Sequence, residues 1–264
     1  MNVSDHAAGQ PVAPYHAIAA GYDLIMSHVA YNDWAHFTDL ILQNYHPNPR
    51  RILELGCGTG SFALELQPMG GYDYVASDIS PAMIEVAKRK AAMELGQVDF
   101  IVQDFTQFEV EQPFDIVVLL YDGINYLLEK DQLASLFSCV FKALKPGGIF
   151  FFDQSTPANS INNEAYFEDE GEQDGFIYKR GSAYNRETRL HKTSFEVRVR
   201  DDVFFEEHFQ RAYTYEDVVA HIRNAGFKIE DAFDGFSTDP IHAESERIHW
   251  IIRRPRKHQE NFGN

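Results

Sequence analysis

Three glycines separated by single residues, in the stretch Glu54-Leu-Gly-Cys-Gly-Thr-Gly60, are the strongest chemical feature of this sequence. Residues without a Cβ take backbone conformations that others avoid, and they let a ligand approach the main chain closely. A helix expected from about Ser61 would point its free N–H groups back across this turn. Such a corner can accept a phosphate, a carboxylate or the backbone of a ligand.

An alternation of strands and helices surrounds this corner and predicts a doubly wound α/β sheet. Short apolar runs bounded by polar residues or glycine are typical of buried parallel strands, and helical patterns separate them. These runs lie at residues 52–55, 72–77, 98–102, 114–120 and 149–152. Ser80-Pro81 is an N-cap followed by proline at the first helical position, and Lys145-Pro-Gly-Gly148 ends the helix before the fifth strand. Repeated βαβ units require right-handed crossovers.

The alternation stops at about residue 155, and residues 156–174 are polar and expected to be irregular. Three later runs have strand chemistry, at residues 176–184, 193–200 and 203–213. In the middle run apolar Phe195 and Val197 alternate with charged neighbours, so one face of the sheet is covered. That pattern is typical of antiparallel strands. We therefore expect an inserted antiparallel β platform at residues 156–213.

The two ends of the chain complete the predicted organisation. Residues 1–46 should form a helical cap, with a loose end over 1–13 and Asn32 as the N-cap of its second helix. After the insert, Thr214 and Asp217 predict a capping box for a last helix, followed by two strands. The predicted main domain comprises residues 1–155 and 214–255, and residues 256–264 form a tail.

Composition excludes several classes of protein. With 44% hydrophobic and 24% charged residues, the chain has the composition of an ordinary globular protein. Its formal net charge of −17 argues against nucleic-acid binding, and no apolar run is long enough for a membrane-spanning helix. The N-terminus lacks the pattern of a secretory signal, so the expected location is the cytoplasm. Cys57 and Cys139 support neither a disulfide framework nor a zinc site, and no metal site is predicted.

The spacing of the glycines separates two classes of ligand. Dinucleotide-binding folds use G-x-G-x-x-G, but here Gly60 comes one residue early and Ser61 takes the expected place. The pattern Glu54-x-Gly56-x-Gly58-x-Gly60 resembles the signature of class I S-adenosylmethionine-dependent methyltransferases, which have a Rossmann-like fold. The resemblance covers about residues 15–155 and 214–253. It implies a mostly parallel seven-stranded sheet whose last strand is antiparallel.

The resemblance also implies S-adenosylmethionine as cofactor and assigns residues to it. In that family an acidic residue at the position of Asp78 accepts hydrogen bonds from both ribose hydroxyls. A residue at the position of Asp104 accepts a hydrogen bond from the adenine amino group. Leu120 and Tyr121 match the family's residues that lie beneath the methionine part of the cofactor. The expected cofactor-binding residues are Tyr22, Trp34, Glu54, Gly56, Cys57, Gly58, Gly60, Asp78, Ile79, Met83, Asp104, Phe105, Leu120 and Tyr121. Trp34 and Cys57 also fit packing roles, and Glu54 and Asp104 could instead bond groups of their own loops.

Two further stretches narrow the resemblance. Tyr22-Asp-Leu-Ile-Met26 with Tyr31-x-x-Trp34, and Asp122-Gly-Ile-Asn-Tyr126, look like a bacterial small-molecule subgroup with an inserted antiparallel sheet. That subgroup is related to sugar-amine N-methyltransferases, in which a histidine can occur near the place of Tyr126. The chain departs from them at this position. The expected substrate-binding residues are Asp122, Asn125 and Tyr126.

Methyl transfer from a sulfonium is an in-line displacement in which the protein supplies alignment and electrostatics. A base is needed only when the acceptor must lose a proton. The candidate catalytic residues are Tyr126, His208 and Tyr213, and Glu206 and Glu207 could join them. His208 could act as a base near neutral pH or could face solvent on the platform.

These observations predict an enzyme that methylates nitrogen or oxygen of a small molecule. A non-catalytic module that binds S-adenosylmethionine or S-adenosylhomocysteine is the alternative, and an open pocket would favour it. A nicotinamide-dependent oxidoreductase is disfavoured by the glycine spacing. Adenine-amine DNA methyltransferases carry an Asn/Asp-Pro-Pro-aromatic run after the fourth strand, whereas this chain has Tyr121-Asp-Gly-Ile. The expected partner is therefore a small methyl acceptor, with no nucleic acid and no membrane.

Overall fold

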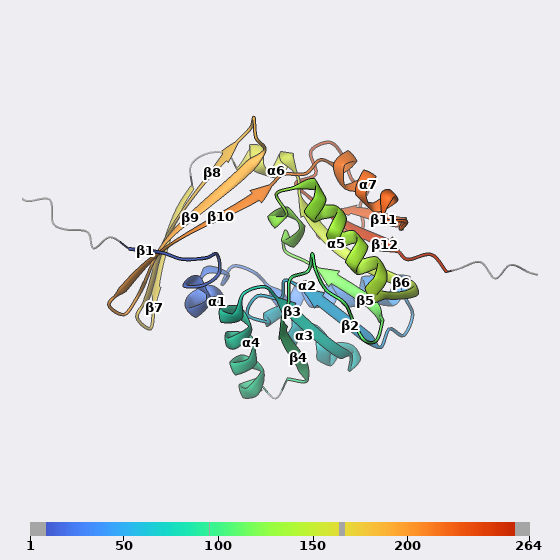
Figure 1. Cartoon of the computed structure of the whole chain (residues 1–264), viewed down its shortest axis with the longest axis horizontal. Helices are drawn as coiled ribbons and strands as arrows, with labels where there is room; N and C mark the ends of the chain where they lie inside the picture. The colour runs from blue at the N-terminus through green and yellow to red at the C-terminus, as the bar shows by residue number, and fades with distance from the viewer. Residues whose placement is uncertain (1–8, 95, 164–166, 257–264) are drawn as a thin grey trace, which may run out of the picture.

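Two sheets organise the computed structural model of the chain, which describes residues 9–94, 96–163 and 167–256 (Figure 1). The larger sheet has the order β11-β12-β6-β5-β2-β3-β4. Its strands are β2 (Arg51–Leu55), β3 (Asp73–Asp78), β4 (Val98–Val102), β5 (Phe114–Leu119), β6 (Leu144–Ser155), β11 (Lys228–Asp234) and β12 (Arg247–Arg253). The last strand, β12, runs antiparallel to both of its neighbours, and the other pairs are parallel. The doubly wound sheet with a reversed last strand is therefore confirmed.

Helices cover both faces of the larger sheet. One face packs against α2 (Tyr31–Tyr45), α3 (Ser61–Gly70) and α4 (Pro81–Glu94). The other face packs against α5 (Lys130–Ala143) and α7 (Tyr215–Asn224). In β5 every side chain is buried, with Val117 and Leu119 on one face and Ile116 and Val118 on the other. This two-sided burial explains the uninterrupted apolar run of that strand.

Helices lie in the region predicted as the cap, but the second of them begins differently from the prediction. A 3-10 turn η1 (Ile18–Gly21) and a short helix α1 (Tyr22–Ile25) precede α2. Ala30 is the N-cap of α2, with no side-chain cap, so the prediction for Asn32 is wrong. Asn32 instead donates to Glu65 of α3 at 2.9 Å. This contact joins the start of α2 to α3.

The insert forms a second sheet that stands apart from the main one, to the left in Figure 1. It contains β7 (Phe167–Gln173), β8 (Phe176–Asn185), β9 (Leu190–Val199) and β10 (Asp202–Arg211), which pair antiparallel in sequence order. The prediction of an irregular stretch at 156–174 is wrong, because α6 (Pro157–Asn162) and β7 lie there. As the edge strand, β7 carries charged side chains that discourage further pairing, and it therefore lacks the apolar alternation of a strand.

The N-terminal end joins this second sheet, so residues 10–13 are not the expected loose end. Strand β1 (Gln10–Pro11) pairs parallel with β10 opposite Phe204 and Phe205. The platform is consequently a mixed sheet of five strands rather than a purely antiparallel one. An edge position tolerates Pro11, which has no N–H to donate. Cap and insert also share an apolar cluster that includes Ile18, Phe176 and Phe195.

The C-terminal part follows the prediction closely. Thr214 and Asp217 form a reciprocal capping box at the start of α7, and Gly226 follows its end with a φ of +85°. Apart from Arg256, the predicted tail lies outside the described residues. Within the described ranges, no helix has the length and apolarity needed to cross a membrane.

Candidate active site

The glycine corner joins β2 to α3 with three left-handed glycines. Gly56, Gly58 and Gly60 have φ values of +66°, +54° and +78°. A Cβ on Gly60 would lie 2.7 Å from the ring of Phe100 and 3.1 Å from the Cβ of Ala87. Glycine at position 60 is therefore required both by the backbone conformation and by the packing of the loop against β4 and α4.

Asp78 ties the end of β3 to this corner. Its Oδ2 accepts from the N–H of Gly58 at 2.9 Å, and its Oδ1 accepts from the N–H of Ser80 at 2.8 Å. The side chain is 8% exposed, and burial raises its pKa against the lowering effect of these N–H groups. Each oxygen keeps a lone pair, so the carboxylate can still accept hydrogen bonds from a ligand such as a ribose.

Glu54 is a second buried carboxyl group beside the loop. Its Oε2 accepts from the hydroxyl of Tyr74 at 2.8 Å. Burial is the main cause that raises the pKa of Glu54 to about 8, and the nearby Asp78 raises it further, while the Tyr74 contact lowers it. A cation placed next to this group would favour its ionised form. The ammonium group of a bound amino acid would meet that need.

A cavity of about 50 Å³ opens between the glycine corner, the cap and the end of β5; we call it the donor cavity. Its lining comprises Tyr22, Tyr31, Trp34, Glu54, Gly56, Cys57, Gly58, Thr59, Ser61, Phe62, Leu120 and Tyr121. Most of the residues expected to bind the cofactor from the glycine loop, the cap and the fourth strand meet here. Tyr31, Thr59, Ser61 and Phe62 were not predicted to bind the cofactor, although Tyr31 belongs to the quoted Tyr31-x-x-Trp34 motif.

The residues expected around an adenine ring are less uniformly placed. Ile79 is 60% exposed after β3, and the ring of Phe105 lies beside Gly56. Asp104 uses Oδ1 to accept from the N–H and hydroxyl of Thr106, at 2.8 and 2.7 Å, which is the local turn contact considered above. Met83 is fully buried in the cluster of cap and insert, so it presents no surface to a ligand there.

A second cavity of about 150 Å³ lies beneath the insert; we call it the acceptor cavity. Its lining comprises Tyr15, Ile18, Tyr22, Ile25, Met26, His28, Tyr121, Asp122, Tyr126, Arg180, Thr193, Phe195, His208 and Gln210. The cap, the insert, the two residues Tyr121 and Asp122 that follow β5, and the turn η2 (Gly123–Tyr126) supply these side chains. Tyr22 and Tyr121 line both cavities, so the two spaces share a wall.

His208 and Tyr126 are brought together in the acceptor cavity. His208 is 3% exposed, so the solvent-facing alternative for this residue is not what is observed. Their ring centres are 6.2 Å apart, and the ring of Tyr15 contacts both, at 4.6 Å from His208 and 5.6 Å from Tyr126. The Tyr15 hydroxyl donates to that of Tyr126. Burial raises the pKa of the Tyr126 hydroxyl, which therefore stays protonated near neutral pH. Tyr15 was not predicted, because no motif in the neighbouring sequence indicates that it lies at a site.

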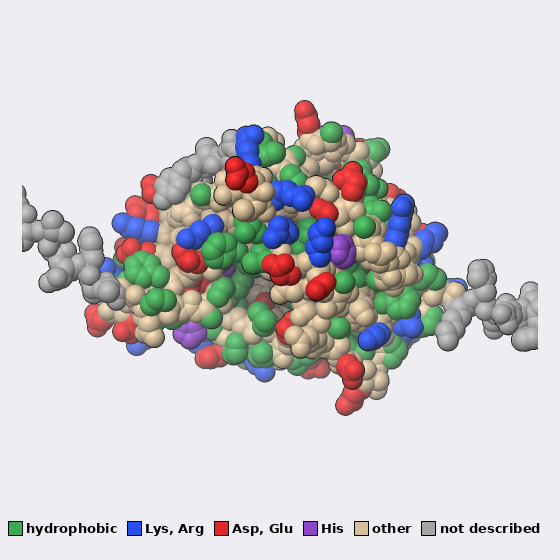
Figure 2. All heavy atoms as spheres, turned by 45° about the horizontal axis from the view of Figure 1, so that its top comes forward, with side chains coloured by type: hydrophobic (Ala, Val, Ile, Leu, Met, Phe, Trp, Pro, Cys, Tyr) green, Lys and Arg blue, Asp and Glu red, His purple; other side chains and the backbone are tan. Residues whose placement is uncertain are grey.

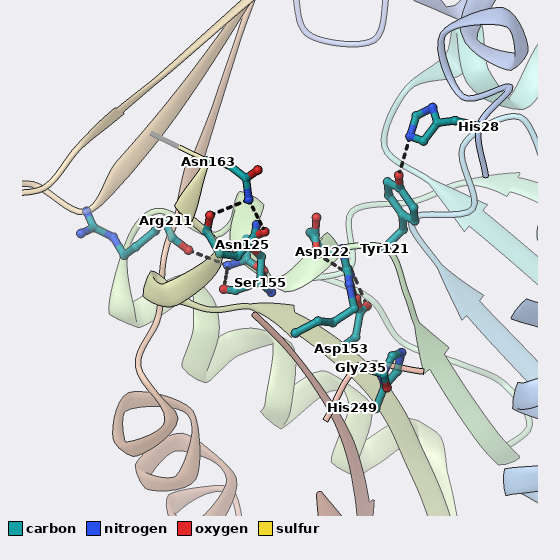
Figure 3. Close-up of polar contacts among 12 residues, drawn as sticks. His28, Tyr121, Asp122, Asn125, Asp153, Ser155, Asn163, Arg211, Gly235 and His249 are labelled. Atoms are coloured by element: carbon teal, nitrogen blue, oxygen red, sulfur yellow. Dashed lines mark hydrogen bonds and ion pairs between the residues drawn. The ribbon is translucent and has the colours of Figure 1, made fainter. Parts of the chain in front are cut away.

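Tyr213 and Asn125 do not reach this cavity with free polar groups. Tyr213 is buried in the core beneath α5, and its hydroxyl donates to the carbonyl of Leu127 at 2.5 Å. Asn125 donates to the carbonyls of Ser155 and Arg211 at 2.8 and 2.7 Å, and its oxygen accepts from the N–H of Ser155 at 3.0 Å (Figure 3). These contacts tie η2 to β6 and β10, which is a structural role.

Asp122 belongs to a charged cluster that sequence patterns did not indicate. Tyr121 and Asp122 follow β5 with left-handed φ values of +62° and +63° (Figure 3). Arg247, at the start of β12, pairs with Asp122 at 2.5 Å and with the fully buried Asp153. Its guanidinium also lies 5.5 Å from the ring centre of Tyr121. The cluster fixes the strained turn at the shared wall of the two cavities.

Other surfaces offer less chemistry. Among the described residues, no group of three or more His, Cys, Asp and Glu side chains could hold a metal ion. The face seen in Figure 2 carries acidic and basic side chains intermixed. A phosphate backbone would require a continuous basic surface, so this face does not suggest nucleic-acid binding.

Comparisons with known proteins agree with this geometry. A sequence profile described as "Methyltransferase domain" matches residues 52–148. The protein named "Putative methyltransferase YqeM" from Bacillus subtilis is 30% identical over 239 residues, which cover 89% of this chain and 94% of that protein. A crystal structure of an S-adenosylmethionine-dependent methyltransferase from Clostridium acetobutylicum superposes with a TM-score of 0.77 and 26% identity, covering 91% of this chain and 99% of that one. The sugar N-methyltransferase KedS8 from Streptoalloteichus has the same fold, with a TM-score of 0.72, 22% identity and 97% coverage of both chains.

The chain belongs to the class I S-adenosylmethionine-dependent methyltransferases. The site fits this cofactor on three observations. The glycine corner lets a ligand approach the main chain closely, and Asp78 can accept further hydrogen bonds at the end of β3. A cation beside the donor cavity would favour the ionised form of Glu54. S-adenosylmethionine, when bound, supplies an electrophilic methyl group on a positively charged sulfur atom. The predicted cofactor and family are thereby confirmed.

Proposed function

We propose that this enzyme methylates a nitrogen or oxygen atom of a small molecule held in the acceptor cavity. The observation that carries the proposal is the shared wall of Tyr22 and Tyr121 between the two cavities. An in-line displacement needs donor and acceptor on opposite sides of the transferred carbon, within contact distance. Two cavities that adjoin at Tyr22 and Tyr121 support that arrangement, because they would place donor and acceptor next to each other.

The same proposal assigns different roles to the main domain and to the insert. The main domain, residues 1–155 and 214–255, would hold the cofactor at the carboxyl ends of its parallel strands. The insert, residues 156–213, would select the acceptor together with the cap. At about 150 Å³ the acceptor cavity suits a small molecule or one end of a larger one. Its cover of cap and insert would exclude water from the reaction.

His208 supports an acceptor that loses a proton. A hydroxyl or an ammonium group must give up a proton to accept the methyl group, and an imidazole at this place could take it. Tyr126 and Tyr15 offer hydroxyl groups that can orient the acceptor without ionising. Burial raises the pKa of Asp122 while Arg247 lowers it, and a positive charge near the wall would favour the ionised form of this carboxyl group.

The main rival is a module that binds the cofactor without catalysis. An open and unlidded pocket would favour that function, whereas the acceptor cavity of this chain lies beneath the insert and contains buried polar side chains. A nicotinamide-dependent oxidoreductase would need the third glycine one residue later. The left-handed Gly60, packed on Phe100, instead fixes the present spacing.

Two measurements test the proposal. Titration calorimetry with S-adenosylmethionine, S-adenosylhomocysteine and NAD should give binding of the first two and none of the third. Incubation with S-adenosylmethionine and a low-molecular-weight bacterial metabolite extract should yield S-adenosylhomocysteine and a product heavier by one methyl group. Cofactor binding without any product across such extracts would favour the non-catalytic module instead.

A further inference from the structure

Glu206 is a buried carboxylate that the proposed function does not yet use. It lies on β10 and is 1% exposed. Successive side chains of a strand point to opposite faces, so Glu206 and His208 point inward while Glu207 points outward. On the outer face Glu207 pairs with Lys192, and it does not line the acceptor cavity, so it does not join the catalytic residues as the sequence had suggested. A carboxylate as deep as Glu206 costs free energy unless hydrogen-bond donors surround it.

Three main-chain groups of the cap provide such donors. The Oε1 of Glu206 accepts from the N–H groups of Ala17 and of Ile18, the latter at 3.0 Å. Its Oε2 accepts from the N–H of Tyr15 at 2.8 Å. These contacts join the insert to a segment about 190 residues earlier in the chain. They also prevent the carboxylate from rotating, because both oxygens are held.

The fourth partner of Glu206 is the imidazole of His208. The Nε2 of His208 lies 3.1 Å from the Oε2 of Glu206. An ionised carboxylate can only accept, so Nε2 must carry the hydrogen. In the neutral ring the lone pair is then on Nδ1, which accepts no hydrogen bond from any described residue. The rings of Tyr15 and Phe195 hold the imidazole edge-on at 4.6 and 5.2 Å.

We infer that Glu206 is a positioning residue that sets the tautomer of His208 for catalysis, an inference that rests on the proposed function. Glu206 keeps the hydrogen on Nε2, and the unprotonated Nδ1 of His208 serves as the base in the acceptor cavity. The acceptor atom gains the methyl group and gives its proton to Nδ1, and the electron pair of the broken carbon–sulfur bond stays on sulfur. The carboxylate remains ionised opposite the imidazolium, which returns its proton to solvent after the product leaves.

The variant Glu206→Gln separates this role from simple filling of space. A glutamine oxygen would serve the two N–H groups of Ala17 and Ile18, and its NH₂ group would then face both His208 and the N–H of Tyr15, which would lose its acceptor. Because NH₂ donates, it would bind an unprotonated Nε2 and move the hydrogen to Nδ1. The ring would stay in place with its lone pair turned away from the acceptor. Glu207→Gln is the matched control, since it makes the same chemical change on the outer face of the same strand.

Nitrogen NMR of protein labelled with ¹⁵N-histidine measures the tautomer directly, and a His208→Asn variant assigns the signal. The wild type and Glu207→Gln should show hydrogen on Nε2, and Glu206→Gln should show it on Nδ1. A wild-type His208 with its hydrogen on Nδ1 would overturn the inference. This readout needs neither cofactor nor acceptor. The tautomer of the wild type can therefore overturn the inference even if Glu206→Gln does not fold or the proposed function fails.

Turnover provides the second readout. In the metabolite extract described above, Glu206→Gln should form S-adenosylhomocysteine about 100-fold more slowly than the wild type, the lower range for loss of a general base. Its Kd for S-adenosylmethionine should stay within about threefold, because a mispositioned base slows the transfer and not the binding of the cofactor. Glu207→Gln should react at the wild-type rate. Equal rates for Glu206→Gln and the control would refute the catalytic role, whereas a wild type that forms no product would refute the proposed function alone.

Discussion

Replacing Glu54 with glutamine should remove a pH dependence of stability that the wild type carries between about pH 5 and pH 8. Burial of this carboxyl group raises its pKa from 4.5 to about 8. The folded protein therefore binds this proton more tightly than the unfolded chain does. Under linkage, stability falls as the pH rises through this window and becomes constant above it. Glutamine keeps the shape and the contact to Tyr74 but cannot ionise.

The size of the effect follows from the two pKa values. Each pH unit between them costs the folded state about 1.4 kcal/mol. The wild type should therefore lose at most about 2 kcal/mol by pH 6 and about 4 to 5 kcal/mol by pH 8, relative to its stability at low pH. Such a loss would be a large fraction of the total stability of a domain, which is about 5–15 kcal/mol.

Urea unfolding of the cofactor-free protein at several pH values from 5 to 8 measures this difference. The stability of Glu54→Gln relative to the wild type should increase steadily with pH. Glu109→Gln is the matched control, because Glu109 is exposed and its replacement should leave the profile of the wild type unchanged. If the curves of wild type and Glu54→Gln run parallel, the carboxyl group is already ionised at pH 5 and the reasoning is refuted.

Three other substitutions test separate parts of the site. Asp78→Ala should weaken S-adenosylmethionine binding by about 1.5–3 kcal/mol, the scale for hydrogen bonds to a charged group, and unchanged affinity in calorimetry would show that the ribose lies elsewhere. Gly60→Ala should cost about 1–3 kcal/mol of stability in urea unfolding, because of its φ of +78° and the 2.7 Å approach of its Cβ to Phe100. Arg247→Gln should cost about 3–5 kcal/mol, because it leaves the fully buried Asp153 without its ion-pair partner; a loss below 1 kcal/mol would mean that Asp153 is already neutral.

The sequence predicted those features of the fold that depend on neighbouring residues. The apolar run of β5, the capping box of Thr214 and Asp217, and the left-handed glycines of the corner each follow from short-range physics. The resemblance then joined these pieces into one topology. The donor side was predictable for this reason, because the glycine loop and Asp78 lie within one βαβ unit.

The acceptor side depends on pairings that no local pattern contains. Strand β7 has no apolar alternation, since it is a charged edge, and β1 has only two residues. Arg247 meets Asp153 across two strands that are distant in sequence. The shifts of Tyr213 and Asn125 to structural roles have the same origin, because composition does not reveal which carbonyl group a side chain will reach.

The contact between Glu206 and the N–H of Tyr15 spans 191 residues, which has a consequence for how the protein is made. Chains emerge from the ribosome N-terminal end first, so the cap leaves long before β10 exists. Until then its three N–H groups have only water as a partner, and the acceptor cavity lacks both the insert that covers it and His208. The strands that carry the glycine corner and Asp78 lie within residues 51–78 and can associate much earlier. The acceptor cavity therefore forms later during synthesis than the glycine corner.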